Sequence, residues 1–197
     1  WSTLVDYTEV SDTDYLRDVD RGSVDLNRQA YIRQSAAAGY RTDNWRLDGK
    51  IEEFRLLTDR QLPYRELPRL SADGNYRFDD WVVGLENEYV NFSMNRYFSD
   101  DPANASKLGD LIVGERLRTN YSLHWDKKYT AGYIKPGAGV KTLAYHLDAG
   151  NMRADAETEQ QFAAPQGSLD MGLFFERDTN LFAEDFTQTL EPRAYYL

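Results

Sequence analysis

The chain has 197 residues, a formal net charge of −10 and no cysteine, which excludes a disulfide framework or thiolate metal site and disfavours nucleic acid as a partner. Its mean hydropathy is −0.70, and no apolar run approaches the roughly 20 residues that a membrane-spanning helix needs. A polar average is still compatible with a membrane β-barrel, because the residues of its strands alternate between lipid and lumen.

Nine strand-like segments, separated by turn-forming residues, follow one another along the chain. In several of them apolar and polar residues alternate, as Leu117, Tyr121 and Leu123 do with the residues between them. This period of two predicts an all-β fold of antiparallel strands, each with one apolar and one polar face. Pro136–Gly139 and a change of phase between Ile51 and Phe54 predict bulges. The nine expected strands are 1–10, 30–41, 45–57, 64–76, 81–94, 111–124, 129–147, 166–177 and 186–197.

The connections between these strands alternate in length. Short connections are expected at 42–44, 77–80, 125–128 and 178–185, and longer ones at 11–29, 95–110 and 148–165, with a modest one near 58–63. Outer-membrane barrels have short periplasmic turns and longer extracellular loops on opposite rims, so the pattern favours a barrel. A soluble antiparallel sheet with one wet face would show the same alternation within its strands.

The four tryptophans fall on the rim of the short connections. Trp45 and Trp81 each follow a short connection, Trp125 lies in one, and Trp1 would open an upward strand. Indole rings prefer the headgroup level of a membrane, where an apolar body and a polar N–H are both accommodated. Trp1, Trp45, Trp81 and Trp125 are therefore the expected interface aromatic belt.

Three stretches resemble one known family. They are Val5–Val19, the segment Arg116–Leu147, and Phe175–Asp178 followed by the wording of Phe186–Leu197, FTQTLEPRAYYL. They resemble the LptD family of lipopolysaccharide-assembly outer-membrane proteins, also called the organic solvent tolerance or OstA family. The order and spacing of the three stretches fit that family across essentially the whole chain.

The resemblance implies a segment of an antiparallel transmembrane β-barrel, about nine strands of a larger up-and-down barrel. Residues 1–197 would be its early-to-middle strands, with the periplasmic jelly-roll domain and the gate strands outside this chain. Such a protein is integral to the bacterial outer membrane and assembles lipopolysaccharide in its outer leaflet. The implied partners are the LptE lipoprotein in the barrel lumen, lipopolysaccharide, outer-membrane lipids, and the periplasmic Lpt bridge through the jelly roll. No cofactor, metal, nucleic acid or catalytic activity is expected.

Parity along each strand divides the residues between lumen and lipid, and one missed bulge would invert a whole strand. The candidates for the lumen are Glu86, Glu88, Arg116, Arg118, Asn120, Thr187, Thr189, Glu191 and Arg193. The candidates for the lipid-facing side are Leu117, Tyr121, Leu123, Leu169, Leu173, Phe175 and Phe186.

Glu86 and Glu88 share a face of one expected strand, as Arg116 and Arg118 do on the next. A hairpin would pair Glu88 with Arg116 and Glu86 with Arg118, a ladder in which each pair contributes roughly 0.2–1 kcal/mol. Two alternatives stay open: the carboxylates are unpaired, or they form the acid pair of a glycosidase. The competing functions are accordingly a soluble all-β carbohydrate-binding protein or glycosidase, and another porin-like barrel.

Further polar residues have simple interpretations. The segment 11–29 is expected to be a solvated acidic loop that contains Asp12, Asp14, Asp18, Asp20 and Asp25. A weaker hypothesis brings it together with divalent cations that bridge lipopolysaccharide phosphates, since hard cations prefer oxygen ligands. His124 and His146 have no partner spacing for zinc and are expected on a polar face.

Overall fold

The computed structural model describes residues 1–9, 31–56, 64–94, 113–148, 157–181 and 184–197. The expected acidic loop 11–29 lies outside the described residues. Within them, no helix has the length and hydropathy that crossing a membrane requires. The strands are β1 (Ser2–Asp6), β2 (Tyr31–Arg41), β3 (Trp45–Leu56), β4 (Arg65–Phe78), β5 (Trp81–Ser93), β6 (Gly114–Trp125), β7 (Lys127–Tyr129), β8 (Gly132–Leu147), β9 (Glu159–Leu173), β10 (Phe175–Leu181), β11 (Glu184–Leu190) and β12 (Arg193–Tyr196).

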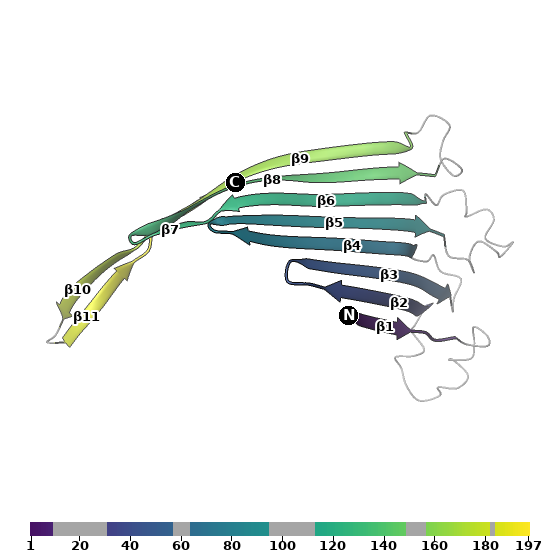
Figure 1. Ribbon diagram of the computed structural model, residues 1–197, viewed down its shortest axis with the longest axis horizontal. Helices are drawn as coiled ribbons and strands as arrows, with labels where there is room; N and C mark the ends of the chain where they lie inside the picture. Colours follow the sequence, from purple (N-terminus) through teal and green to yellow (C-terminus); the bar gives the residue numbers. More distant parts are fainter. Residues whose placement is uncertain (10–30, 57–63, 95–112, 149–156, 182–183) are drawn as a thin grey trace.

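The strands form one curved layer in which chain neighbours are also sheet neighbours (Figure 1). The order is β1-β2-β3-β4-β5-β6-β8-β9-β12, with β7 on β8, and every described pair is antiparallel. Strands β10 and β11 form a two-stranded extension that projects from one end of the layer (Figure 1). The prediction of an all-β, antiparallel, up-and-down fold is confirmed, and the described sheet is an open one.

Several labelled strands are segments of longer ones. β6 and β7 pair with β8 in the same register series, which runs from Gly114↔Leu147 to His124↔Gly137 and resumes from Lys127↔Ile134 to Tyr129↔Gly132. β9 and β10 likewise share one register against β12 and β11, since Leu169↔Tyr196 and Phe175↔Leu190 belong to the same series. The twelve labelled segments are therefore nine passes of the chain, the number that the sequence pattern predicts.

The end of the chain differs from the prediction. The expected single strand 186–197 is divided into β11 and β12 at Glu191 and Pro192, because proline has no N–H to donate to a ladder. The expected connection 178–185 is instead made of the ends of β10 and β11, around 182–183. β9 begins at Glu159, so the expected connection 148–165 is also too long.

The turn expected at 125–128 is wrong as well. Trp125 ends β6, and the chain continues as β7 before it turns at 130–131. The charged sequence Asp126–Lys128 imitates a turn, but Lys127 and Tyr129 both retain partners on β8. Two of these charged side chains are paired, Asp126 with Lys135 at 3.1 Å and Lys127 with Asp80 at 2.5 Å, so their polarity does not break the strand.

The two predicted bulges are also corrected. Pro136 keeps its register, opposite Leu169, with no shift along β8. β3 pairs with β2 without interruption through Ile51 and Phe54. The shift lies in β4 between Glu66 and Arg69, where its pairing with both β3 and β5 slips by one residue. A bulge at Leu67 and Pro68 accounts for both slips, because proline is tolerated where the ladder is interrupted.

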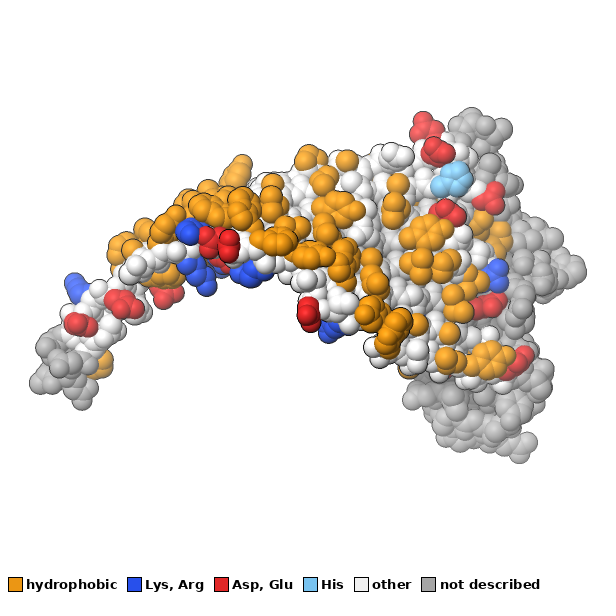
Figure 2. Space-filling view, in the orientation of Figure 1, with side chains coloured by type: hydrophobic (Ala, Val, Ile, Leu, Met, Phe, Trp, Pro, Cys, Tyr) orange, Lys and Arg blue, Asp and Glu red, His pale blue; other side chains and the backbone are white. Residues whose placement is uncertain are grey.

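The layer has almost no interior. Among the described residues, the only buried hydrophobic ones are Ile32, Phe54 and Val90. Many large apolar side chains are exposed, and in Figure 2 hydrophobic side chains gather in bands over the strands. A soluble sandwich would cover such a face with a second apolar layer, and none is present in the described part of the chain. The fold therefore presents a wall with two accessible faces.

Candidate functional site

The cross-strand register assigns the predicted lumen residues to one face. Glu88 lies opposite Ser71 on β4 and Arg118 on β6, and directly opposite residues of a ladder point to the same side of the sheet. We call the side of Glu88 the polar face. Followed through the registers, it holds all nine lumen candidates: Glu86, Glu88, Arg116, Arg118, Asn120, Thr187, Thr189, Glu191 and Arg193.

The opposite side, that of Leu117, is called the apolar face. The same registers place on it all seven lipid candidates: Leu117, Tyr121, Leu123, Leu169, Leu173, Phe175 and Phe186. Six of the seven are exposed, and Leu169 is half-buried. Polar and apolar candidates thus lie on opposite sides along every strand that holds them.

The four tryptophans lie on the apolar face, at the strand ends that meet the short connections. Trp81 is opposite Trp125, with ring centroids 6.3 Å apart, and Trp1 contacts Tyr40 at 4.5 Å. The Trp45 indole N–H donates to the Tyr76 hydroxyl at 2.5 Å. The indole of Trp45 also covers Gly74 opposite it, where a Cβ would come within 3.0 Å of the ring. An aromatic row with polar partners therefore follows this rim.

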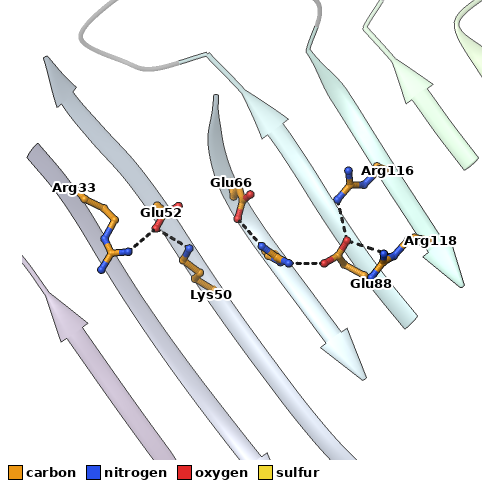
Figure 3. Close-up of polar contacts among 8 residues, drawn as sticks. Arg33, Lys50, Glu52, Glu66, Glu88, Arg116 and Arg118 are labelled. Carbon is orange, nitrogen blue, oxygen red and sulfur yellow. Dashed lines mark hydrogen bonds and ion pairs between the residues drawn. The ribbon is translucent and has the colours of Figure 1, made fainter. Parts of the chain in front are cut away.

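The polar face is organised around Glu88 (Figure 3). Glu88 is buried, with 7% of its surface exposed. Its carboxylate accepts hydrogen bonds from Arg69 at 2.6 Å and Arg116 at 2.8 Å, and lies 3.9 Å from the Arg118 guanidinium. Three strands thus supply one carboxylate and three cations. Charge-assisted hydrogen bonds of this length are among the stronger ones in proteins.

The predicted ladder is correct in one contact and wrong in its register. Glu88 does bond Arg116, but diagonally, since the residue opposite Glu88 is Arg118. Glu86 lies opposite Asn120, which donates to it at 2.9 Å, and so the expected pair of Glu86 with Arg118 is absent from the described contacts. The real register is two residues from the expected one, which leaves the face unchanged because side chains repeat every two residues.

A second cluster extends the network toward β1. Glu52, which is buried, is paired with Lys50 at 2.6 Å and with Arg33 at 3.7 Å (Figure 3). Arg33 also reaches Asp6 at 3.3 Å. The sequence analysis missed these residues and Arg69. The alternation along each strand could have indicated that these opposite charges share a face. Which of them are in contact depends on the register between the strands.

A third cluster lies near the short-turn rim. Asp170 accepts two hydrogen bonds from Arg193, at 2.8 and 2.6 Å, and one from the Tyr133 hydroxyl at 3.1 Å. Arg193 was predicted on this face, whereas Asp170 was not identified. At the rim itself, beyond the tryptophan row, a hydrogen bond from Lys127 to Asp80 at 2.5 Å raises the pKa of Lys127.

The remaining candidates are separate from these clusters. Thr187 donates to Asp178 at 3.3 Å on the projecting hairpin, and Thr189 lies opposite Glu176. Glu191 lies at the break between β11 and β12. His124 is on the polar face as expected, but His146 is on the apolar face beside Glu159, 3.6 Å away, which corrects the prediction.

The chemistry that this face offers is that of paired charges: carboxylates held by guanidinium and ammonium groups. A carboxylate held between two guanidinium groups is stabilised in its ionised form, the opposite of what a general acid requires. In the described part of the chain, no three His, Cys, Asp or Glu side chains are grouped to hold a metal ion. The arrangement supports a wet, charged surface backed by an apolar one.

Comparison with known proteins gives a consistent result. A family model described as LptD, LPS transport system D, matches residues 1–197. Proteins named LPS-assembly protein LptD are similar over almost the whole chain: 37% identity in Saccharophagus degradans over 100% of this chain, 34% in Alcanivorax borkumensis over 99%, and 32% in Chromohalobacter salexigens over 96%. The chain spans only 22% to 25% of the length of these relatives.

Proposed function

The chain belongs to the LptD family, and on that premise we propose that residues 1–197 form part of the wall of an outer-membrane β-barrel that transports and assembles lipopolysaccharide. The polar face lines the lumen and the apolar face contacts lipid. The wall segment consists of early-to-middle strands of the barrel. Further strands of the same barrel pair with the outer edges of β1 and β12, since exposed edges carry unpaired backbone groups.

The observation that supports this proposal most is the segregation of the two faces. Nine polar candidates share one side and seven apolar candidates the other, in a single layer whose apolar side is exposed. In water, an apolar face of this size is unfavourable by about 25 cal/mol for each Å² of apolar surface, so it needs a cover. The hydrocarbon of a membrane is such a cover, and the tryptophan row is suited to its interface.

The charged clusters suit the lumen of such a barrel. Glu88 with its arginines and Glu52 with Lys50 make a surface on which the cations and carboxylates are largely paired. A paired surface remains hydrated without holding a single anionic ligand tightly. We assign it to the passage of the sugar part of lipopolysaccharide and to contact with the LptE lipoprotein inside the barrel.

A cysteine scan tests the orientation of the wall. Each residue from Leu117 to His124 is replaced by cysteine in the complete protein, with native thiols masked, and labelled with a fluorophore. Its access to a lipid-soluble quencher is then measured. Quenching at 117, 119, 121 and 123, and not at 118, 120, 122 and 124, is expected. Equal shielding at all eight positions would contradict the membrane wall and would favour a covered soluble sheet.

A further inference from the structure

The projecting hairpin has a strand edge that the chain leaves open. β10 pairs with β11 on one side, from Phe175↔Leu190 to Leu181↔Glu184. On its other side the sheet ends just before β10 begins. The pairing of β9 with β8 stops at Leu173↔Gly132, and the last bond on that side is from the Phe174 N–H to the Ala131 carbonyl at 2.8 Å.

This edge differs from the edges of β1 and β12. Those two are continuous with the main sheet, so further strands of a barrel can pair with them. The strand that would lie beside β10 on this side is the β7–β8 hairpin. That hairpin ends in its turn at 130–131, before it reaches the level of β10. The β10 edge therefore stays open even when the barrel is complete.

The stagger of the hairpins explains why this one projects. Through the β3–β4 register, the turn 42–44 falls about four residues short of the turn 79–80. Through the β5–β6 register, the turn 79–80 again falls about four residues short of the turn 130–131. The next step, from 130–131 to the end of the β10–β11 hairpin, is about eight. The hairpin thus extends about four residues, or roughly 13 Å at 3.3 Å per residue, beyond the regular series (Figure 1).

Backbone alternation identifies the groups that face the open edge. The N–H of Leu173 points to the break between β11 and β12, where it bonds the Pro192 carbonyl, and that of Phe174 points the other way. Continued along β10, the alternation directs the N–H and C=O groups of Glu176 and Asp178 outward, while those of Arg177 bond β11. The side chains of Glu176 and Asp178 both project on the polar face and give this edge an acidic side.

We propose that the β10 edge is a binding site for an extended strand of a partner protein in which basic residues alternate with apolar or small ones. Main-chain hydrogen bonds to Glu176 and Asp178 provide the register, and basic side chains opposite the two carboxylates provide selectivity. A second copy of this chain is disfavoured there, because its own β10 would place like charges opposite one another. This inference rests on the proposed function in one respect, the location of this rim in the periplasm.

The apolar face of the hairpin fits the same partner. Phe175 is 52% exposed and lies opposite Leu190, also exposed, beyond the level of the tryptophan row. Closer to the tip of the hairpin than Phe175 and Leu190, the Arg177 side chain donates a hydrogen bond to Gln188. A partner strand on the β10 edge extends this two-stranded ribbon to three, the number at which a sheet with an apolar face becomes independently stable.

The test uses the complete protein in lipid nanodiscs and a synthetic nine-residue peptide in which lysine and valine alternate. Two control peptides carry glutamate in place of lysine, or N-methylated backbone amides on the pairing side. Amide hydrogen exchange is measured at β10 with and without each peptide. The lysine peptide is expected to slow exchange at Glu176 and Asp178 and to leave Arg177, already bonded to β11, unchanged. Neither control peptide is expected to protect any of them.

Two variants make the result specific. Asp178→Lys is expected to weaken binding of the lysine peptide about fivefold and to strengthen that of the glutamate peptide. Asp43→Lys makes the same charge change in the exposed turn 42–44 on the same rim. It is expected to leave the binding of both peptides unchanged. The exchange rate at Arg177 reports whether the hairpin of each variant is folded.

The proposal is overturned if no peptide protects Glu176 and Asp178, if the N-methylated peptide protects them equally, or if Asp43→Lys weakens binding as much as Asp178→Lys. These outcomes are independent of the membrane orientation, which the cysteine scan reads at Leu117 to His124. Failure of the scan alone would withdraw the periplasmic location and leave the edge as a binding site. Failure of peptide protection alone would leave the barrel wall intact.

Discussion

Glu88 lies directly opposite Arg118, yet its carboxylate bonds Arg116, two residues away along β6, at 2.8 Å. The diagonal bond leaves the Arg118 side chain 59% exposed and 3.9 Å from Glu88. Arg69 and Arg116 thus donate hydrogen bonds to this carboxylate, while the Arg118 side chain is more than half exposed on the polar face.

Glu88→Gln is expected to destabilise the wall. The change leaves three arginines around a neutral amide, and we expect a cost of about 1–3 kcal/mol, below the 3–5 kcal/mol of a fully buried pair because the arginines are partly exposed. The measurement is urea unfolding of the complete protein, followed by tryptophan fluorescence.

Glu86→Gln is the matched control, on the same strand and face. Glu86 is exposed and accepts a hydrogen bond from Asn120, so its change is expected to cost less than about 0.5 kcal/mol. Equal losses for the two variants would show that the cluster around Glu88 does not contribute specifically to stability.

Gly172→Ala is expected to disturb the sheet, whereas Gly167→Ala on the same strand is tolerated. A Cβ at Gly172 would meet the Tyr133 ring at 2.5 Å, but at Gly167 the nearest atom is 3.9 Å away. Overpacking costs typically about 1–3 kcal/mol, so the urea midpoint is expected to fall for Gly172→Ala only. A larger loss for Gly167→Ala would contradict the placement of Tyr133 over Gly172.

Arg193→Lys is expected to loosen the pairing of β12 with β9. The guanidinium makes two bonds to Asp170, a geometry that a lysine ammonium cannot reproduce. Faster amide exchange is expected between Arg193 and Tyr196 in the complete protein, with unchanged exchange in β5. If Arg177→Lys, on the neighbouring hairpin, speeds exchange in β12 equally, the bidentate pair is not the cause.

The tryptophan row is expected to lie at headgroup depth. In variants that retain Trp81 alone, with phenylalanine at the other three positions, phospholipids brominated near the glycerol are expected to quench more strongly than those brominated near the chain end. Stronger quenching by the deep bromines would place Trp81 in the hydrocarbon. Absence of quenching by either lipid would contradict an interfacial row.

Much of the architecture was predictable from local pattern. The alternation within 111–124 and 81–94 indicated which residues share a face, and the strands β2, β3 and β5 begin or end where the short connections at 42–44 and 77–80 predict. Glu86, Glu88, Arg116 and Arg118 were therefore grouped correctly on one face. The bland sequence of 157–165 and the charged Asp126–Lys128 gave no comparable signal, and there the boundaries were wrong.

Which residues of one strand share a face follows from the sequence alone, because a side chain in a strand changes face at every step and this period of two is local. The cross-strand partners, in contrast, depend on the register between strands. A register shift of two residues keeps every face but changes the opposite neighbours, so Glu88 lies opposite Arg118 rather than Arg116, and Glu86 lies opposite Asn120 rather than Arg118. The open edge of β10 likewise depends on where the β7–β8 hairpin turns, a relation between strands about 45 residues apart that no local pattern contains.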